Sequence, residues 1–511
     1  MKNALPKSST DSLPILTPTH FFQYETHPLW IWYDLFGDQS KKEEISEFVL
    51  KLMDEGIIHE KTFIEGLDYT EVKAENTEEA FHATFDLMMR GTPLIYQGCI
   101  QIEREGTLYR GRPDLLEIRE GTSHFGNWHY APIEIKSSSE IKPLHKHQLN
   151  FYSLILEELQ RALPQEMGVI NRHQTRLQYL ASTEDYEKTK MLSEEILVVM
   201  RGNKPPSTIT SKSKNSPWFK VALREAEDSR DVSLVYKLDN RSLKNLRGMG
   251  IKTLDDLVCA KIDRLPKIPY ASADRLQRAQ LQAKALIQDT IIPLETSPEL
   301  PSHRLKLYFD IEGNPLLDID YLFGIWVSGD PDQLYTPKNN ARVYEGEEGY
   351  FVYFLAEHPN EEESMWKAFL EWIAVLPNEY SVYHYANYEK VHIRKLNDQY
   401  GGSETLEIFQ SNLIDLQKVV EQSAIFPLYF YSIKDLAKSR FINFKWRHQK
   451  AGGGLSVFWY DQWLATGDKT ILEDIINYNE DDVRATEKLY TYIFKLIKVN
   501  TRGNRKVGIN L

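Results

Sequence analysis

The sequence contains almost no cysteine: Cys99 and Cys259 are the only two among 511 residues. Two widely separated cysteines exclude a disulfide framework and favour a reducing cytoplasm. The sequence also lacks an apolar run of membrane length and, at its start, the apolar core of a signal peptide. These absences predict a cytoplasmic protein without a membrane partner.

An excess of positive charge is missing too. The formal net charge of −13 argues against a protein that coats nucleic acid without specificity. No glycine-rich run leads into the lysine of a P-loop, so the sequence predicts no ATPase. What remains is 42% hydrophobic and 26% charged residues, a globular composition. The length exceeds that of one ordinary core and predicts two or three domains.

The first pattern that carries chemistry lies between residues 111 and 152. Short apolar runs bounded by Gly, Pro or Ser predict one strand at Asp114 and another that carries Glu134 and Lys136. Because residues two apart in a strand point to the same face, Glu134 and Lys136 emerge side by side. The two carboxylates are ligands of the kind that Mg²⁺ and Mn²⁺ prefer. A neighbouring lysine could orient the attacking water and stabilise charge on a phosphate.

These residues resemble the RecB-like branch of the PD-(D/E)XK nucleases, which carries a Gly-x-x-Asp strand, a Glu-x-Lys strand and a Gln-x-x-x-Tyr helix. In this sequence the three elements are Gly111-Arg-Pro-Asp114, Glu134-Ile-Lys136 and Gln148-Leu-Asn-Phe-Tyr152. The resemblance implies a restriction-endonuclease-like N-terminal domain. It also implies metal ligands at Asp114 and Glu134, and catalytic roles for Lys136, Gln148 and Tyr152.

RecB-like nucleases also carry a metal-binding histidine on an upstream helix. His59 matches it, and His82, on another apparent helix, is the rival position. Many relatives hold an iron–sulfur cluster on four cysteines, and this chain has too few for such ligation. We therefore expect no iron–sulfur cluster. A basic patch with Lys142 and Lys146 precedes Gln148; it predicts either phosphate contacts or simply the solvated start of a helix.

The middle of the chain reads as a linker followed by a helical hairpin. Residues 201–230 begin with a run rich in Pro, Ser and Lys, which predicts a linker and a helix. Gly248 and Gly250 then mark a turn between two helices that resembles a helix-hairpin-helix, whose amides can hold a DNA phosphate. The alternative is a small helical spacer. Three prolines between residues 293 and 301 predict a boundary without regular structure.

The second pattern follows that boundary. An apolar strand ends in Asp310-Ile-Glu312, so both carboxylates face the same side, and a second strand of a hairpin follows at 321–328. Near the end of the sequence, Tyr478 and Asp482 lie four apart on a helix and share one face. Three or four converging carboxylates can hold two divalent ions roughly 3.5–4 Å apart.

This half resembles the DEDD exonucleases of RNase H-like fold, in their tyrosine subgroup and most closely the YprB-type domain. The resemblance implies that Asp310, Glu312 and Asp482 bind metal and that Tyr478 positions the water. The resemblance implies Glu389 as a further metal ligand, although most members have Asp there, and Asp481 is the rival for the last ligand, Asp482. Lys434 and Asp415 match recurrent supporting positions. The resemblance also implies 3′–5′ polarity.

The sequence therefore predicts a multidomain α/β protein whose C-terminal domain contains a mixed sheet. The expected divisions are a RecB-like domain at 1–200, the linker at 201–230, the helical spacer at 231–292 and an RNase H-like domain at 302–500. We expect an enzyme with two nuclease sites that uses Mg²⁺ or Mn²⁺ on single-stranded DNA ends in repair, recombination or defence. A helicase in trans is a candidate partner. The competing interpretation is a nucleic-acid-binding scaffold in which one or both sites are degenerate.

Overall fold

The computed structural model describes residues 13–44, 47–266, 271–295, 298–330, 334, 340–448 and 454–507, with the backbone alone at 47–55 and 500–507. The chain folds into two compact units, Met1–Ala226 (unit 1) and Glu227–Leu511 (unit 2). Both units combine helices with sheets, which confirms the predicted multidomain α/β class. Across the described ranges, no helix is both long and apolar enough to cross a membrane.

Unit 1 contains a six-stranded sheet in the order β2-β3-β6-β7-β8-β9 and a three-stranded sheet in the order β1-β5-β4. Its strands are β1 (Ile15–Leu16), β2 (Thr70–Glu71), β3 (Leu94–Tyr96), β4 (Ile100–Arg104), β5 (Thr107–Gly111), β6 (Leu115–Ser123), β7 (Gly126–Ile135), β8 (Glu166–Ile170) and β9 (Arg176–Leu180). Its helices are α1 (Pro18–Thr26), α2 (Pro28–Phe36), α3 (Glu47–Ile64), α4 (Thr77–Met89), α5 (Pro143–Gln160), α6 (Thr183–Met200) and α7 (Phe219–Asp228), the last two residues of which belong to unit 2.

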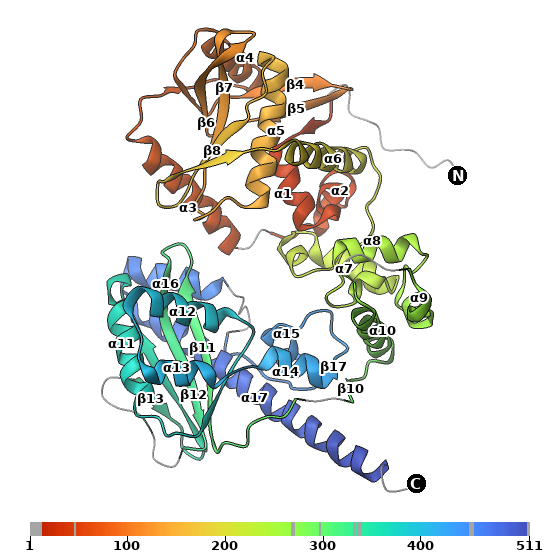
Figure 1. Ribbon diagram of the computed structural model, residues 1–511, viewed down its shortest axis with the longest axis vertical. Coiled ribbons are helices and arrows are strands. Elements are labelled where there is room, and N and C mark those ends of the chain that lie inside the picture. Colours follow the sequence, from red (N-terminus) through yellow and green to blue (C-terminus); the bar gives the residue numbers. More distant parts are fainter. Residues whose placement is uncertain are drawn as a thin grey trace. The chain divides into compact units, whose positions relative to one another are not determined.

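The side chains of β6 and β7 alternate between two faces of the larger sheet of unit 1. Leu115, Ile133 and Ile135 are buried in one cluster with Ile64 of α3. Glu134, between the two isoleucines, points to the opposite face, where α5 packs on β7 (Figure 1). The predicted strand alternation therefore directs the acid of β7 toward α5.

Unit 2 begins with helices and continues into a mixed six-stranded sheet in the order β13-β14-β12-β11-β15-β16. The strands are β10 (Ile292–Pro293), β11 (Leu305–Asn314), β12 (Ile319–Ser328), β13 (Asn340–Val343), β14 (Gly349–Leu355), β15 (Tyr380–His384), β16 (Leu413–Asp415) and β17 (Ala424–Ile425). The helices are α8 (Asn240–Gly248), α9 (Leu254–Cys259), α10 (Ala273–Gln288), α11 (Glu362–Ile373), α12 (Tyr388–Tyr400), α13 (Glu404–Ser411), α14 (Leu416–Ser423), α15 (Ile433–Lys438), α16 (Leu455–Thr466) and α17 (Lys469–Val507).

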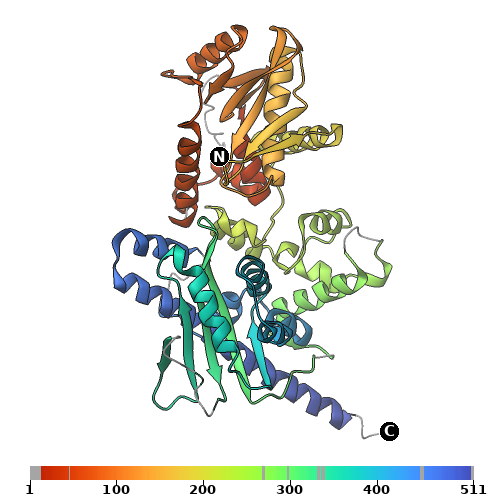
Figure 2. The same cartoon turned by 60° about the vertical axis from the view of Figure 1, so that its left-hand side comes forward.

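Helices cover both faces of the central strands of this sheet. The hairpin of β11 and β12 is antiparallel, while β15 runs parallel to β11. Along β11, Tyr308 packs against α17 and Phe309 packs against α11 and α13. Both views show α17 running along β11 and β12 (Figures 1 and 2). Asp310 and Glu312 share the face of Tyr308, so both point toward α17.

The proline-rich segment after α10 departs from the prediction at its first residue. We expected no regular structure from Pro293 onward, but Pro293 pairs with Ala424 as part of β10, antiparallel to β17. Proline is tolerated in such a short edge strand because its carbonyl still accepts hydrogen bonds. The strand therefore joins the end of the helical region to β17 within unit 2.

The aromatic core under β11 gives a stability prediction. Phe309 is 1% exposed and contacts rings of α11, α13 and β12. We expect Phe309→Ala to lower the free energy of unfolding of unit 2 by about 3–5 kcal/mol because it leaves a cavity. The matched control is Ile408→Ala, whose side chain is 51% exposed and whose loss should change stability by less than about 0.5 kcal/mol. Denaturant unfolding of both variants measures the difference; equal effects would contradict the described packing.

Candidate active site

Three acids meet between β11 and α17. One carboxylate oxygen each from Asp310, Glu312 and Asp482 lies within 4.8 Å of the others. Asp310 and Glu312 come from one face of β11, and Asp482 comes from α17, which packs on that strand. Only 9% of Glu312 and 8% of Asp482 is exposed, so the cluster is largely withdrawn from water.

Burial and mutual repulsion oppose ionisation of this cluster. Burial, followed by the charges of Glu312 and Asp482, raises the pKa of Asp310 well above its ordinary value. Burial and then the charge of Asp482 raise the pKa of Glu312 to about 7. The pKa of Asp482 is raised too, chiefly by burial. A divalent cation would favour the charged forms of all three acids, and a set of hard oxygen ligands fits Mg²⁺ or Mn²⁺.

Each acid of the cluster is held by a neutral donor. The hydrogen bonds are Asn479 Nδ2 to Asp310 Oδ2 at 2.8 Å, Ser456 Oγ to Glu312 Oε2 at 2.6 Å and Trp446 Nε1 to Asp482 Oδ1 at 2.6 Å. These donors orient the carboxylates but add no positive charge. The cluster therefore keeps its attraction for a cation while its oxygens are fixed in direction.

Tyr478 lies one turn before Asp482 on the same helix. Its hydroxyl accepts a hydrogen bond from Lys434 Nζ, which also lies 3.9 Å from Asp482 Oδ2. Burial first, and the charge of Asp482 second, raise the pKa of Tyr478 well above its ordinary range, so the hydroxyl stays protonated. The rival acid Asp481 instead accepts hydrogen bonds from Arg447. The helix thus presents Asp482, and not Asp481, to the cluster.

Glu389, the expected fourth ligand, lies near the cluster but outside the group of three. Its Oε2 is 3.1 Å from Nδ1 of His384, and both side chains are almost fully buried. Its charge contributes to the raised pKa of Asp310, which places it close to the other acids. The structure therefore brings three of the four predicted acids together and pairs the fourth with a histidine.

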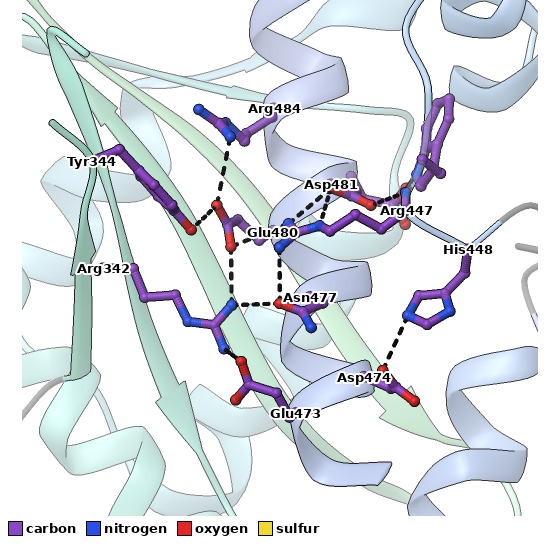
Figure 3. Close-up of polar contacts among 12 residues, drawn as sticks. Arg342, Tyr344, Arg447, His448, Glu473, Asp474, Asn477, Glu480, Asp481 and Arg484 are labelled. Atoms are coloured by element: carbon purple, nitrogen blue, oxygen red, sulfur yellow. Dashed lines mark hydrogen bonds and ion pairs between the residues drawn. The ribbon is translucent and has the colours of Figure 1, made fainter. Parts of the chain in front are cut away.

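The far side of α17 is fixed by a buried ion-pair network. Glu480 is fully buried and accepts hydrogen bonds from Tyr344 at 2.5 Å and from Arg342 at 3.0 Å. Arg447 lies 3.1 Å and Arg484 lies 3.8 Å from the same carboxylate. Figure 3 shows these side chains converging on Glu480 from β13 and the residue after it, from the loop before α16 and from α17 itself. The network ties the helix to the edge of the sheet.

The residues of the first predicted nuclease pattern, between 111 and 152, also lie together in unit 1. The carboxylate of Asp114 accepts a hydrogen bond from the Ile135 backbone at 2.7 Å. Lys136 Nζ contacts Glu134 and lies 3.9 Å from Asp114 Oδ2. Burial and then the charge of Glu134 raise the pKa of Asp114 to about 7. Although burial alone would lower the pKa of Lys136, the two carboxylates outweigh it and raise the value.

The Gln-x-x-x-Tyr helix meets this site as predicted by its spacing. Gln148 Nε2 donates to Glu134 at 2.8 Å and to the hydroxyl of Tyr152 at 2.9 Å. A side chain at Gly111 would place its Cβ 2.4 Å from the Tyr152 ring. The glycine of the motif is therefore explained by the close approach of the α5 tyrosine to the end of β5.

The helical histidine is not part of this hydrogen-bonded set. His59 lies on α3, and its buried Nε2 has no hydrogen-bond partner in the described part of the chain; His82 is exposed. The next residue, Glu60, accepts a hydrogen bond from Gln97 at 2.5 Å, and its charge acts on Lys136. Sequence reasoning missed Glu60, although it directly follows His59. Only the helix rotation, which the sequence did not reveal, distinguishes the two positions.

The predicted nucleic-acid contacts find less support. Lys146 Nζ lies 5.4 Å from the centre of the Tyr179 ring, and Lys142 forms the N-cap of α5. At the turn after Gly248, the backbone N–H groups of residues 249–253 all donate within the chain, two of them to the Asp256 carboxylate. A phosphate at Gly250 would have to replace these bonds. The roles of Lys142, Lys146, Gly248 and Gly250 stay predictions.

Residues 307–494 match the family model of the RNase_H superfamily. This range contains all of β12, all but the first two residues of β11, the three clustered acids and Tyr478. Unit 2 therefore contains an RNase H-like domain, as predicted; such domains are generally metal-dependent nucleases with nucleic acid substrates. No curated protein matches the chain. The RecB-like assignment of unit 1 and the YprB subtype stay predictions.

The raised pKa of Glu312 predicts how metal-free protein responds to pH. The folded-state pKa of about 7 lies above the ordinary 4.5, so the ionised side chain destabilises the fold. The free energy of unfolding that depends on a neutral Glu312 is therefore fully present below about pH 4.5, and it is lost as the pH rises through about 7. We expect Glu312→Gln to raise Tm in EDTA at pH 8 and to change it little at pH 4.5. A Tm difference that is independent of pH would contradict repulsion as the cause.

The contact between Gly324 and Asn479 gives a second test. A Cβ at Gly324 would lie 1.6 Å from Asn479 Oδ1, so Gly324→Ala must displace the donor of Asp310. We expect about 1–3 kcal/mol of destabilisation from overpacking and weaker Mn²⁺ binding. Because Asn479→Ala removes the clashing group, the double variant should bind Mn²⁺ no more weakly than the worse single variant. If titration calorimetry shows that the two substitutions weaken Mn²⁺ binding additively, Gly324 does not act on the metal site through Asn479.

Proposed function

We propose that unit 2 is a metal-dependent exonuclease that hydrolyses phosphodiester bonds at the ends of single-stranded DNA. The observation that carries this proposal is the convergence of Asp310, Glu312 and Asp482 within 4.8 Å inside an RNase H-like domain. In the proposal these acids, with Glu389, hold two Mg²⁺ or Mn²⁺ ions. Bound metal would lower the pKa of a water and stabilise charge developing on the phosphate.

The side chains around the acids support specific roles in this reaction. The protonated hydroxyl of Tyr478 can orient a water by hydrogen bonding, and Lys434 holds that hydroxyl in place. Ser456 and Asn479 keep their carboxylates turned toward the cluster. Lys434 also brings a positive charge within 3.9 Å of Asp482, where it could stabilise charge developing on a phosphate.

A second, independent nuclease site in unit 1 is favoured by the ion pair at Lys136. Its amine lies between Glu134 and Asp114, and its raised pKa keeps it charged. A permanent cation beside two potential metal ligands suits a role in orienting water and stabilising phosphate charge. We propose a RecB-like site here with Glu60 beside it. His59 as a metal ligand stays part of the sequence-based prediction.

Together the two sites favour a protein that processes DNA ends in repair, recombination or defence, with a helicase in trans as the proposed partner. The competing function is a nucleic-acid-binding scaffold that never cuts. That function predicts binding of single-stranded oligonucleotides without cleavage in either Mg²⁺ or Mn²⁺. The buried and oriented acids favour catalysis over such a scaffold. A site that only binds phosphate needs no carboxylates, because their charge repels the phosphate.

Separate substitutions test both sites in one assay. We expect Asp310→Ala to lower one Mn²⁺-dependent cleavage activity on end-labelled oligonucleotides at least about 100-fold, and Lys136→Ala to lower a distinct one similarly. Each removes a charge that the reaction uses. The controls are Glu404→Ala and Lys188→Ala, which change exposed charges and should cleave normally. Unchanged cleavage in both site variants would refute the assignments, and binding without any cleavage by wild type would favour the scaffold.

A further inference from the structure

The segment 444–448, between α15 and α16, binds two adjacent acids of α17. The indole Nε1 of Trp446 donates to Asp482 Oδ1 at 2.6 Å. The next residue, Arg447, donates its backbone N–H to Asp481 at 2.7 Å and its Nε to the same carboxylate at 2.8 Å. Two consecutive residues of the segment are therefore fastened to two consecutive residues of the helix.

Further contacts extend this attachment along the helix. Arg447 also donates to Asn477 at 2.8 Å and lies 3.1 Å from the buried Glu480. His448 lies 3.3 Å from Asp474, nearer the start of α17. Figure 3 shows Arg447 reaching along α17 between Asp481 and Glu480. The segment thus has contacts over about two turns of the helix, which fix where its residues lie.

The indole itself is enclosed. Trp446 is 6% exposed, and its ring packs edge-on against Phe444 at 4.9 Å between centroids. Lys438 Nζ lies over the indole at 5.3 Å. A ring held on these sides has little freedom to turn, so its N–H has one direction. That direction fixes the orientation of the Asp482 carboxylate, whose other oxygen lies 3.9 Å from Lys434 Nζ.

We propose that Trp446 is a positioning residue that presents Asp482 to the divalent metal of the active site, and that Arg447 holds Trp446 in place. The inference rests on the proposed function of the acid cluster. The indole is uncharged, so it orients the carboxylate without neutralising it. Donors that orient metal ligands change metal affinity by about 10–100-fold when removed.

A second buried indole provides a matched control. Trp463 is 5% exposed, and its Nε1 donates at 2.8 Å to a backbone carbonyl, that of Glu357. Replacing it with Phe removes the same chemical group from a similar environment, but no acid of the cluster loses a donor. Any general effect of losing a buried indole hydrogen bond should therefore be the same in both variants.

The test measures Mn²⁺ binding to the metal-free full-length protein by electron paramagnetic resonance, without reference to cleavage. The parent of every sample carries Asp114→Asn, so that unit 1 lacks one of its two proposed metal ligands throughout. We expect Trp446→Phe to weaken Mn²⁺ binding about 10-fold and Trp463→Phe to leave it unchanged. Arg447→Ala should weaken binding in the same direction by a smaller factor, because the indole N–H remains but its segment is loosened. If Trp446→Phe fails to fold, Arg447→Ala decides the question alone.

The possible outcomes separate this inference from the function on which it rests. Unchanged Mn²⁺ binding in Trp446→Phe, with normal binding by the parent, would overturn the positioning role and leave the proposed function standing. Equal losses in the Trp446 and Trp463 variants would also overturn it. If neither the parent nor wild-type protein binds Mn²⁺ at any concentration up to several millimolar, the proposed function itself fails, and the inference fails with it.

Discussion

The burial of three like-charged side chains in one small volume is the constraint on which the structure of unit 2 depends. Asp310, Glu312 and Asp482 lie where water cannot screen their charges; burial raises all three pKa values, and the charges of neighbouring acids raise them further. Such a cluster survives only if the surrounding fold holds it. The aromatic packing on both faces of β11 provides that support, and the bare backbone at Gly324 lets α17 approach closely enough to add the third acid.

The two clusters of acids solve the same electrostatic problem in different ways. In unit 1 a lysine provides the compensating charge from within the chain, since Lys136 lies between Glu134 and Asp114. In unit 2 the direct partners of the three acids are an amide, a hydroxyl and an indole, none of them charged. Lys434 Nζ lies 3.9 Å from Asp482, but this one positive charge is shared among three acids, so part of the compensating charge there must come from outside the chain. This contrast favours a stronger dependence on bound cations in unit 2 than in unit 1.

Local periodicity was sufficient to predict the parts of the sites that lie close together in sequence. The two-residue spacing of Asp310 and Glu312 placed both on one face, and the four-residue spacing of Tyr478 and Asp482 placed them on one side of a helix. The supporting donors were not predictable because they lie 36, 144 and 169 residues from the acids they hold. For Glu60, one residue beyond the predicted histidine, the missing information was the rotation of α3.

In unit 2, contacts on the far side of α17 fix the rotation of this helix. Asp481 and Asp482 are adjacent and chemically identical, so a rotation of the helix by about 100° would exchange them. Buried ion pairs contribute little net stability, but they discriminate strongly between alternative arrangements because an unpaired buried charge is very unfavourable. Glu480 is fully buried and would lose Arg342 and Arg447 in any other rotation, whereas Arg484 turns with it on the same helix. Residues that never face the acid cluster therefore select which aspartate joins it.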